Sequence, residues 1–375
     1  MIIYGALAIP IITVLILLLL YKHELVWWEL LLNFGITIIL IFGCKLLVEK
    51  VQTSDTEYWG GYVTHSEYYE RWNEEVPCTH DKECCTGSGK NRSCTSCGTE
   101  HAYDVEDHPP EWIIYNNNGE EIHIQPSVFD RLCKQFSNKK FVDMHRDYHD
   151  IDGNMYVTNW DKKDETLEPV FTTHIYENRI QASTNVMNFE EVNPKEFGLY
   201  DYINPNTYNF TPIIGAFDTN KQKLGVRKLI LLNSKFGQPK QVFVWLLIFN
   251  NKQFEAGMAQ ESYWKGGNKN EINICVGLDK SGKVDWGYIF SWTTVEAIKI
   301  SIRGEILKQK GQEFNLEKLI DTIQPEIYKK FERRHFKEFD YITVEPPIEW
   351  ILGIYIFILL MNVGIGVYVV KNNIN

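Results

Sequence analysis

The sequence predicts a membrane-anchored α+β protein with an N-terminal transmembrane helical hairpin, a Cys/His-rich β subdomain, an α/β layered domain and a C-terminal transmembrane helix. Three apolar runs lead to this prediction: Ile2–Leu20, Trp27–Leu47 and Trp350–Val370. Each run approaches the roughly 20 residues that a helix needs to cross a bilayer. The region between the runs is polar and carries most of the formal net charge of −11, so we expect it to be water-soluble.

The first run differs from a signal peptide. Its first ten residues contain no Lys or Arg, and no small-residue cleavage site follows it. Because only Tyr21–Glu24 separates the first two runs, residues 1–50 are expected to form a hairpin of two antiparallel transmembrane helices. Tryptophans at the ends of the runs favour lipid contact over the alternative, a buried pair of soluble helices. These tryptophans are Trp27, Trp28 and Trp350.

The charges at the helix ends do not determine the membrane orientation. Lys22 and Lys371 share one side of the predicted bilayer, whereas Lys45 and Lys50 share the other, so the positive-inside rule favours neither orientation. We expect an integral membrane protein of the cell (inner) membrane. The acidic charge excludes nucleic-acid binding, which needs an excess of Lys and Arg on one face.

The soluble region is expected to contain several parts before the last helix. They are a Cys/His-rich β subdomain at 51–125, a mixed part of mostly strands and loops at 126–214, an α/β domain at 215–340 and a transmembrane helix at 348–371.

Local signals predict three elements in the first two of these parts. Glu57–Glu70 is expected to be a strand pair or one bulged strand, because Gly60 permits a bend. Asn116–Gly119 has the composition of a hairpin turn. Pro126–Gln135 is expected to form a short helix capped by Ser127.

Helices alternate with apolar strands from Leu224 onward. Val242–Phe249 is an uninterrupted apolar run of strand length, which is typical of a central strand buried on both faces. The predicted order is helix, strand, helix, strand, strand, helix, helix, which indicates an α/β layered unit. The other helices are predicted at Leu224–Phe236, Phe254–Trp264, Val295–Lys308 and Leu316–Phe331, and the other strands at Ile272–Leu278 and Trp286–Ser291.

Three sequence features of this region occur together in a known family. They are a helix that stops at Gly237 before an apolar strand, the motif Ala259-x4-Trp264-x-Gly266, and Asp279 in the turn before the next strand. Through them, residues 215–335 resemble the TPM domain, a small α/β unit found in many membrane-tethered proteins. Glu271 departs from the pattern, since the family commonly has Gly there. The alternative is an unrelated α/β domain with the same element order.

The resemblance implies two kinds of function. Some TPM proteins are described as acid phosphatases, and others look like assembly factors or auxiliary subunits of membrane complexes. It also implies that acidic residues at strand ends hold a divalent cation, Ca²⁺ or Mg²⁺. The candidate catalytic residues are then Asp279, Asp285 and Glu261. The alternative for each is an ordinary solvated charge on a turn or helix.

Five of the eight cysteines lie in one short segment, Cys78-x-His80-x3-Cys84-Cys85-x8-Cys94-x2-Cys97-x3-His101. A Cys-x2-Cys pair fits half of a structural zinc site. The candidate metal ligands are Cys78, Cys84, Cys85, Cys94, Cys97, His80 and His101. On an extracytoplasmic face the same cysteines would instead form disulfides. With either chemistry, Cys94 and Cys97 are expected to act together with Cys78 and one of Cys84 or Cys85.

A second polar string contains His145, His149 and Asp152. These residues could hold a metal, although a strand followed by an Asp-Gly turn is the more ordinary interpretation. The sequence contains no phosphate-binding loop, nucleophile elbow or dinucleotide-binding motif.

The leading functional hypothesis is a multi-pass membrane protein whose soluble domain binds or scaffolds another membrane or membrane-associated protein. The hypothesis rests on the three predicted anchors, on the missing catalytic motifs, and on 20 Tyr and 11 Trp residues, which are types favoured at interfaces. The alternative is a membrane-anchored, metal-dependent phosphatase-like hydrolase. A channel or transporter would carry ionisable residues in the middle of its membrane helices. Glu29 and Lys45 come closest, but both lie near the ends of the second apolar run, so transport is disfavoured.

Overall fold

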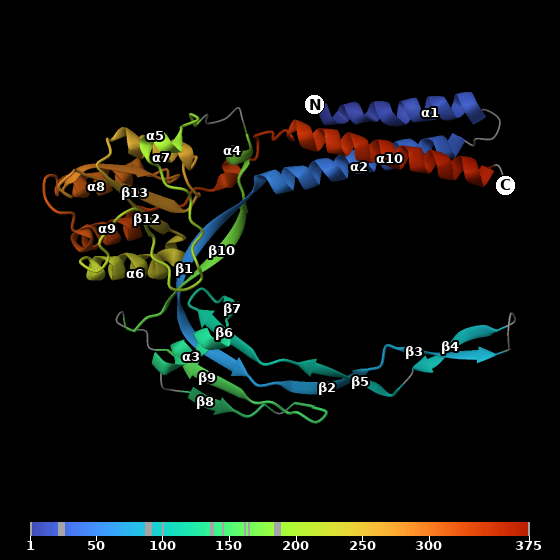
Figure 1. Cartoon of the computed structure of the whole chain (residues 1–375), viewed down its shortest axis with the longest axis horizontal. Helices are drawn as coiled ribbons and strands as arrows, with labels where there is room; N and C mark the ends of the chain where they lie inside the picture. Colours follow the sequence, from blue (N-terminus) through green and yellow to red (C-terminus); the bar gives the residue numbers. More distant parts are fainter. Residues whose placement is uncertain are drawn as a thin grey trace.

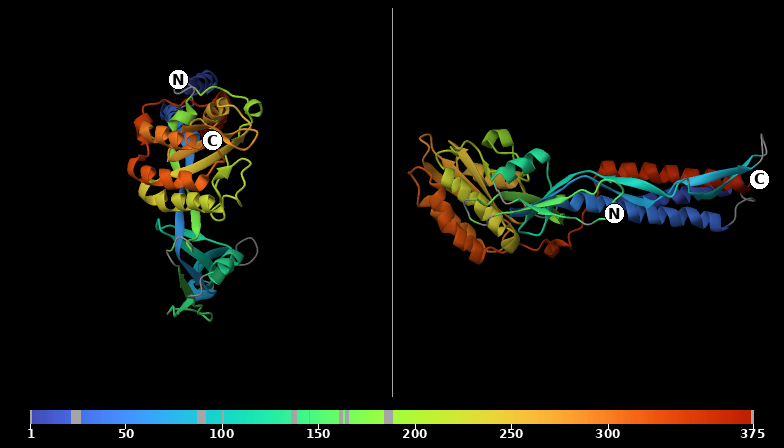
Figure 2. Two further views of the ribbon diagram at one scale, coloured as in Figure 1. Left: turned by 90° about the vertical axis from the view of Figure 1, so that its left-hand side faces the viewer. Right: turned by 90° about the horizontal axis from the view of Figure 1, so that it is seen from below.

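The computed structural model describes residues 2–21, 27–86, 92–99, 101–135, 139–144, 146–160, 163, 166–183 and 189–373. These residues form a helical bundle, an α/β unit and a β region that continues into a long two-stranded arm (Figure 1). The bundle and the arm extend from the same side of the molecule, as two perpendicular views agree (Figures 1 and 2).

The bundle consists of both ends of the chain. It contains the 3₁₀-helix η1 (Ile2–Leu7) and the α-helices α1 (Ala8–Tyr21), α2 (Trp27–Thr53) and α10 (Ile348–Asn373), which lie side by side (Figure 1). The predicted first helix therefore begins as a 3₁₀-helix, and most of the predicted turn lies outside the described residues. Within the part of the chain that is described, Ile348–Lys371 is the helix long and apolar enough to cross a membrane, and Tyr4–Leu20 is apolar but shorter.

The bundle has an apolar core that includes Ile41 and Ile358, a few buried polar groups beside it, and apolar side chains on its outer surface as well. The Asn362 side-chain amide is fully buried and donates to Thr37 Oγ1 at 2.9 Å and to the Ile358 carbonyl at 2.9 Å. The outward-facing side chains are instead large and apolar, for example Ile12, Leu15 and Leu19 on α1, Ile39 and Leu47 on α2, and Leu352, Leu360 and Val367 on α10. A helix bundle in water instead carries polar and charged side chains on its outer surface.

A six-stranded sheet is built around the 16-residue strand β1 (Ser54–Tyr69). The first half of β1 pairs with β10 (Pro169–Glu177), and its second half, after a bulge between Val63 and His65, pairs with β6 (Glu111–Asn116) and β9 (Met155–Asn159). The outer strands are β7 (Glu121–His123) and β8 (Lys139–Val142), and helix α3 (Pro126–Gln135) packs on the sheet through Phe129 and Leu132. The predicted bulged strand, hairpin turn and short helix are thus present, but α3 begins at Pro126, so Ser127 lies inside the helix and is not its cap. The segments 51–125 and 126–214 share one sheet.

The arm consists of two successive ribbons. Strand β2 (Trp72–Pro77) pairs with β5 (Tyr103–His108), and farther out β3 (Asp81–Thr86) pairs with β4 (Ser93–Thr99). The described residues between the ribbons belong to no strand. We call this region the joint of the arm; it comprises residues 78–80 on one side and 101–102 on the other.

The α/β unit has the predicted order of elements. Its sheet has the order β11 (Ile213–Ile214), β12 (Phe243–Asn250), β13 (Glu271–Leu278) and β14 (Val284–Phe290), with β14 antiparallel to the rest. One face packs against α6 (Lys223–Lys240), α8 (Glu296–Leu307) and α9 (Leu316–Lys330), and the other against α7 (Glu255–Tyr263) and the loop that follows the short helix α5 (Pro194–Phe197). The apolar run of β12 is buried on both faces, as predicted.

The prediction that the first helix of this unit stops at Gly237 is wrong. Helix α6 continues to Lys240 and includes Pro239. Gly237 is required for packing instead, because a Cβ atom there would lie 1.8 Å from the carbonyl oxygen of Gly60 on β1. The glycine thus marks the closest approach of α6 to β1, and not the end of a helix.

Candidate functional site

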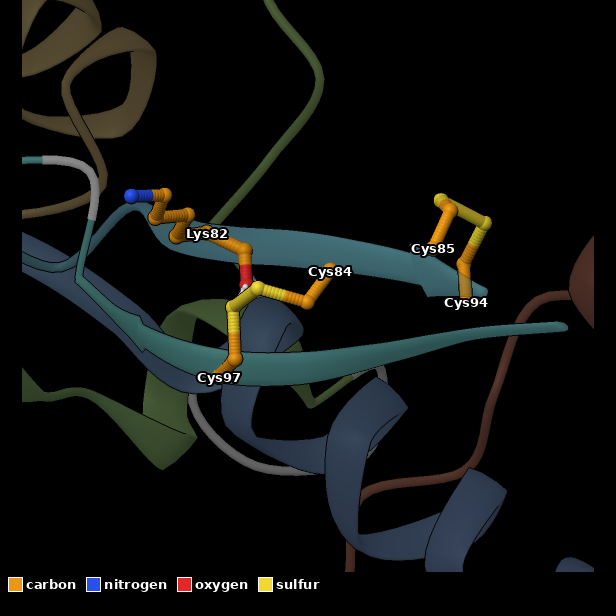
Figure 3. The surroundings of a disulfide bond; sticks show 5 residues. All are labelled: Lys82, Cys84, Cys85, Cys94 and Cys97. Atoms are coloured by element: carbon orange, nitrogen blue, oxygen red, sulfur yellow. Dashed lines mark hydrogen bonds between the residues drawn. A yellow bond between two sulfur atoms is a disulfide. The ribbon is translucent and has the colours of Figure 1, made fainter. Parts of the chain in front are cut away.

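Four of the five clustered cysteines form disulfides at the outer ribbon of the arm. Cys84 bonds to Cys97, and Cys85 bonds to Cys94 (Figure 3). Disulfide sulfurs offer no thiolate, so these four cysteines are not metal ligands in this structure. The predicted participation of Cys78 in the same group is also wrong, because Cys78 is a free thiol.

The strand register explains this pairing. Cys85 lies directly opposite Cys94, and Cys84 lies opposite Thr95, two residues before its partner Cys97. Successive side chains of a strand point to opposite faces, so adjacent Cys84 and Cys85 bond on different faces of the ribbon. Every described residue of β4 is exposed, and a two-stranded ribbon without a core is marginally stable in water. The disulfides therefore supply the stabilisation that burial does not.

The remaining cysteine lies at the joint, where it belongs to a second group of side chains. Cys78, His80, His101 and Asp104 each place one potential ligand atom within 4.8 Å of the others. Asp104 bridges the histidines, with Oδ2 at 3.3 Å from His80 Nδ1 and Oδ1 at 2.5 Å from His101 Nε2. The Cys78 sulfur is buried and lies 4.0 Å from His80 Nδ1. We call these four residues the joint cluster.

The charge state of the joint cluster suits metal binding. Hydrogen bonding to His101 lowers the pKa of Asp104, with a smaller contribution from the Thr79 backbone N–H at 3.3 Å. The Asp104 carboxylate is thus ionised at neutral pH. One thiol, two imidazoles and one carboxylate are four donors of the types that bind Zn²⁺. The structure therefore brings together three predicted ligands, Cys78, His80 and His101, and adds Asp104.

Asp104 was not among the predicted ligands, although two signals point to it. It follows His101 by three residues, and its strand position lies opposite Val76, two residues before Cys78. The second signal depends on the register of β2 and β5, which the spacing of cysteines does not reveal.

Nearby, Glu74, Glu106 and His108 form another group, but it contains no thiol, and its 3.0 Å contact between His108 and Glu74 is an ordinary ion pair.

The three acidic residues predicted to hold a catalytic cation have separate local roles. Asp279 closes its own turn by accepting hydrogen bonds from Ser281 and Lys283, which lower its pKa. Asp285 pairs with Lys310 at 3.2 Å, and Glu261 accepts the hydroxyl of Tyr288. None of the three belongs to a metal-ligand group among the residues that the structure describes.

The second predicted metal string is also not assembled. His145 lies outside the described residues, His149 Nδ1 lies 3.0 Å from Glu75 Oε1, and Asp152 is followed by Gly153 in a left-handed conformation. The expected strand is absent from the described part of this string, which has no regular structure before β9 begins at Met155.

Compared with known proteins, the chain matches no family model, no curated protein and no solved structure. The resemblance to the TPM domain therefore has no support beyond its sequence features. The joint cluster and the disulfide-bonded ribbon are supported by the positions of their side chains in the structure.

Proposed function

We propose that this chain is a multi-pass membrane protein whose arm docks a partner protein outside the cytoplasm. The single observation that carries the proposal is the arm itself, a two-stranded extension with exposed faces that two disulfides stabilise. Such an extension adds nothing to the core of its own chain. Intact disulfides are typical of oxidising compartments, which supports placing the arm on the extracytoplasmic side.

Support for three membrane helices comes from the composition of the bundle surface. Membrane bundles use small or polar residues between helices and apolar residues toward lipid. The buried Asn362–Thr37 pair and the exposed leucines and isoleucines of α1, α2 and α10 fit that pattern. Three spans place the two chain ends on opposite sides of the membrane.

Replacing Ile12 with arginine should impair membrane integration. Ile12 is 56% exposed on α1, so the charge would face lipid and cost about 2.5–3.5 kcal/mol on insertion scales. The measurement is the fraction of protein that resists alkaline carbonate extraction, with Ile12→Leu as the matched control. Release of the unmodified protein into the aqueous fraction would refute the three-helix proposal.

The charge of the inner ribbon indicates the chemistry of the partner. Strands β2 and β5 together contain five carboxylates and no Lys or Arg. Among the described residues, Asp107 pairs with Arg71 at 2.7 Å, and Glu74, Glu75 and Asp104 contact histidines. A partner with a basic surface would complement this ribbon, and an exposed strand edge could add a strand from it.

Site-specific photo-crosslinking in the source membrane tests the docking proposal. A crosslinker at Val105, which is 45% exposed on β5, should give a discrete adduct with another protein, whereas one at Ile300, which is 70% exposed on α8, should not. Glu106→Lys should reduce the Val105 adduct at least threefold, and Glu332→Lys, away from the arm, should not. Equal adducts from both sites, or an adduct containing a second copy of this chain, would contradict the proposal.

We also propose that the joint cluster holds one structural Zn²⁺, which would fix the angle between the two ribbons of the arm. The purified protein should contain about one zinc per chain by elemental analysis. Cys78→Ser and His101→Ala should each lower that content at least fivefold, whereas His123→Ala, an exposed histidine outside the cluster, should not. Zinc content that is negligible, or unaffected by both variants, would exclude the site.

A further inference from the structure

A cleft of about 680 Å³ lies between the start of β1, the short helix α4 (Arg179–Ala182) and the loop that joins α7 to β13. Its volume falls in the range of small-ligand sites, which is about 300–1,000 Å³. The predicted sites do not include this cleft. The elements that form it, namely the start of β1, α4 and α7, lie away from the arm (Figure 1).

Three aromatic side chains in the cleft wall are fixed through their polar atoms. Trp264 Nε1 donates to the Tyr200 carbonyl at 2.8 Å, Trp292 Nε1 donates to the Gly267 carbonyl at 2.9 Å, and the Tyr263 hydroxyl donates to Asp201 at 2.6 Å. Because the polar atoms are already bonded within the protein, what the half-buried rings of Tyr263 and Trp264 offer a ligand is apolar surface, whereas Trp292 is buried and supports the wall from behind. A ring held in this way loses little conformational entropy when a ligand packs on it.

The polar part of the wall is mostly uncharged. Four side-chain amides line the cleft, from Asn178, Gln181, Asn204 and Asn268. Asn178 and Asn268 are buried and donate to Asp55 and Glu271, so the exposed Gln181 and Asn204 are the amides that a ligand can reach. The Asp55 carboxylate is occupied, because it accepts hydrogen bonds from the Tyr176 hydroxyl at 2.7 Å and from the Asn178 amide at 2.8 Å. Among the lining residues that the structure describes, Lys265 is the single Lys or Arg, against the two carboxylates of Asp55 and Glu191. This balance does not favour an anionic ligand.

The loop beside the cleft is held in an unusual conformation. Lys265, Gly266 and Gly267 have φ values of +50°, +84° and +74°. A left-handed conformation is strained for lysine, and such strain persists where surrounding structure enforces it, often at ligand sites.

Buried Glu271 is what enforces this loop. Its carboxylate accepts hydrogen bonds from the Asn268 backbone N–H at 2.9 Å, from Trp245 Nε1 at 3.1 Å and from the Tyr202 hydroxyl. Tyr202 and Asn268 both line the cleft, so Glu271 positions two of its walls from behind. Glu271, the residue that departs from the TPM pattern, thus has a structural role in this chain.

We infer that this cleft binds a neutral sugar unit of a glycan. The C–H faces of a sugar ring pack on aromatic rings, and its hydroxyls both donate and accept hydrogen bonds, as side-chain amides do. An aromatic and amide-rich wall with little positive charge matches that chemistry better than it matches a phosphate or a carboxylate. The inference is independent of the docking proposal for the arm.

The test uses the full chain in phosphatidylcholine nanodiscs, because glycoside detergents carry sugars themselves. Neutral oligosaccharides of glucose, galactose, mannose and N-acetylglucosamine, and sialylated and phosphorylated oligosaccharides, are titrated by calorimetry. We expect at least one neutral oligosaccharide to bind saturably with a Kd below about 1 mM, a range ordinary for weak small-ligand sites.

Two variants locate the binding. Gln181→Ala removes an exposed amide of the cleft and should weaken binding at least tenfold, whereas Gln253→Ala, an exposed glutamine outside the cleft, should leave it unchanged. Binding by no neutral oligosaccharide, tighter binding of the acidic ones, or equal binding by the Gln181→Ala variant would each overturn the inference.

Discussion

Replacing Glu57 with alanine should lower the free energy of unfolding by about 3–5 kcal/mol, the range for removing one partner of a buried ion pair. The Glu57 side chain is 3% exposed and lies on β1. It accepts hydrogen bonds from Arg333, which follows α9, and its Oε1 lies 3.7 Å from Lys269 Nζ in the loop before β13. Alanine would leave the buried Lys269 and the half-buried Arg333 without their carboxylate and would weaken the attachment of β1 to the α/β unit.

Denaturation of the purified protein measures this effect. The matched control is Glu313→Ala, which removes the exposed ion pair of Glu313 with Lys221 and should cost less than about 1 kcal/mol. The double variant Glu57→Leu with Arg333→Met should be more stable than Glu57→Ala, because one of the unpaired charges is removed as well. Equal stability of the Glu57→Ala and Glu313→Ala variants would show that Glu57 does not join the two units.

The same ion cluster predicts a pH dependence. Burial lowers the pKa of Lys269 to about 8, although Glu57 acts in the opposite direction. An unfolded lysine has a pKa of about 10.4, so the unfolded chain binds more protons between the two values. The free energy of unfolding that the titration of Lys269 contributes should therefore grow as the pH rises from 8 to 9.5, and it should be lost as the pH falls through 8. Lys269→Met should flatten that slope.

Gly237→Ala should destabilise the protein by about 3 kcal/mol, at the upper end of the cost of overpacking. The added methyl group would meet the Gly60 backbone, and a Cβ atom on Gly60 would in turn lie 2.3 Å from the Asn233 carbonyl oxygen. Backbone atoms on both sides cannot move aside by changing a rotamer, so α6 would have to move away from β1.

A second glycine provides the control for this substitution. Gly304 lies in α8, and a Cβ atom there would have no neighbour within 4 Å. Gly304→Ala should stabilise the protein by roughly 0.5–1 kcal/mol, because alanine restricts the unfolded chain and favours the helix. If both substitutions changed the melting temperature in the same direction, the close contact of Gly60 with Gly237 would not exist in solution.

The elements that could be predicted are those whose signals are local. The apolar run of β12 and the order of helices and strands around it identified the α/β unit, because periodicity and burial act over a few residues. The pairing of β1 with β10, more than 100 residues away, leaves no comparable local pattern. Gly237 was misinterpreted for the same reason, since its partner is Gly60 on a distant strand.

The candidate site was predictable in part. The Cys/His spacing identified the segment that carries the disulfides and the joint cluster, but spacing alone could not assign a chemistry to each cysteine. The register of β3 and β4 makes that assignment, and the register of β2 and β5 adds Asp104. Asp279 was a candidate ligand because the TPM resemblance implies acidic residues at strand ends, and here its carboxylate accepts a hydrogen bond from the Lys283 backbone N–H instead.

The continuity of one segment has a mechanical consequence. Helix α2 ends at Thr53 and β1 begins at Ser54, while only Glu70 and Arg71 separate β1 from β2. No flexible linker interrupts this line, and hydrogen bonds to β10, β6 and β9 stiffen it along its length. A force applied to the arm would therefore be transmitted directly to the bundle, and a tilt of α2 would rotate the arm with it.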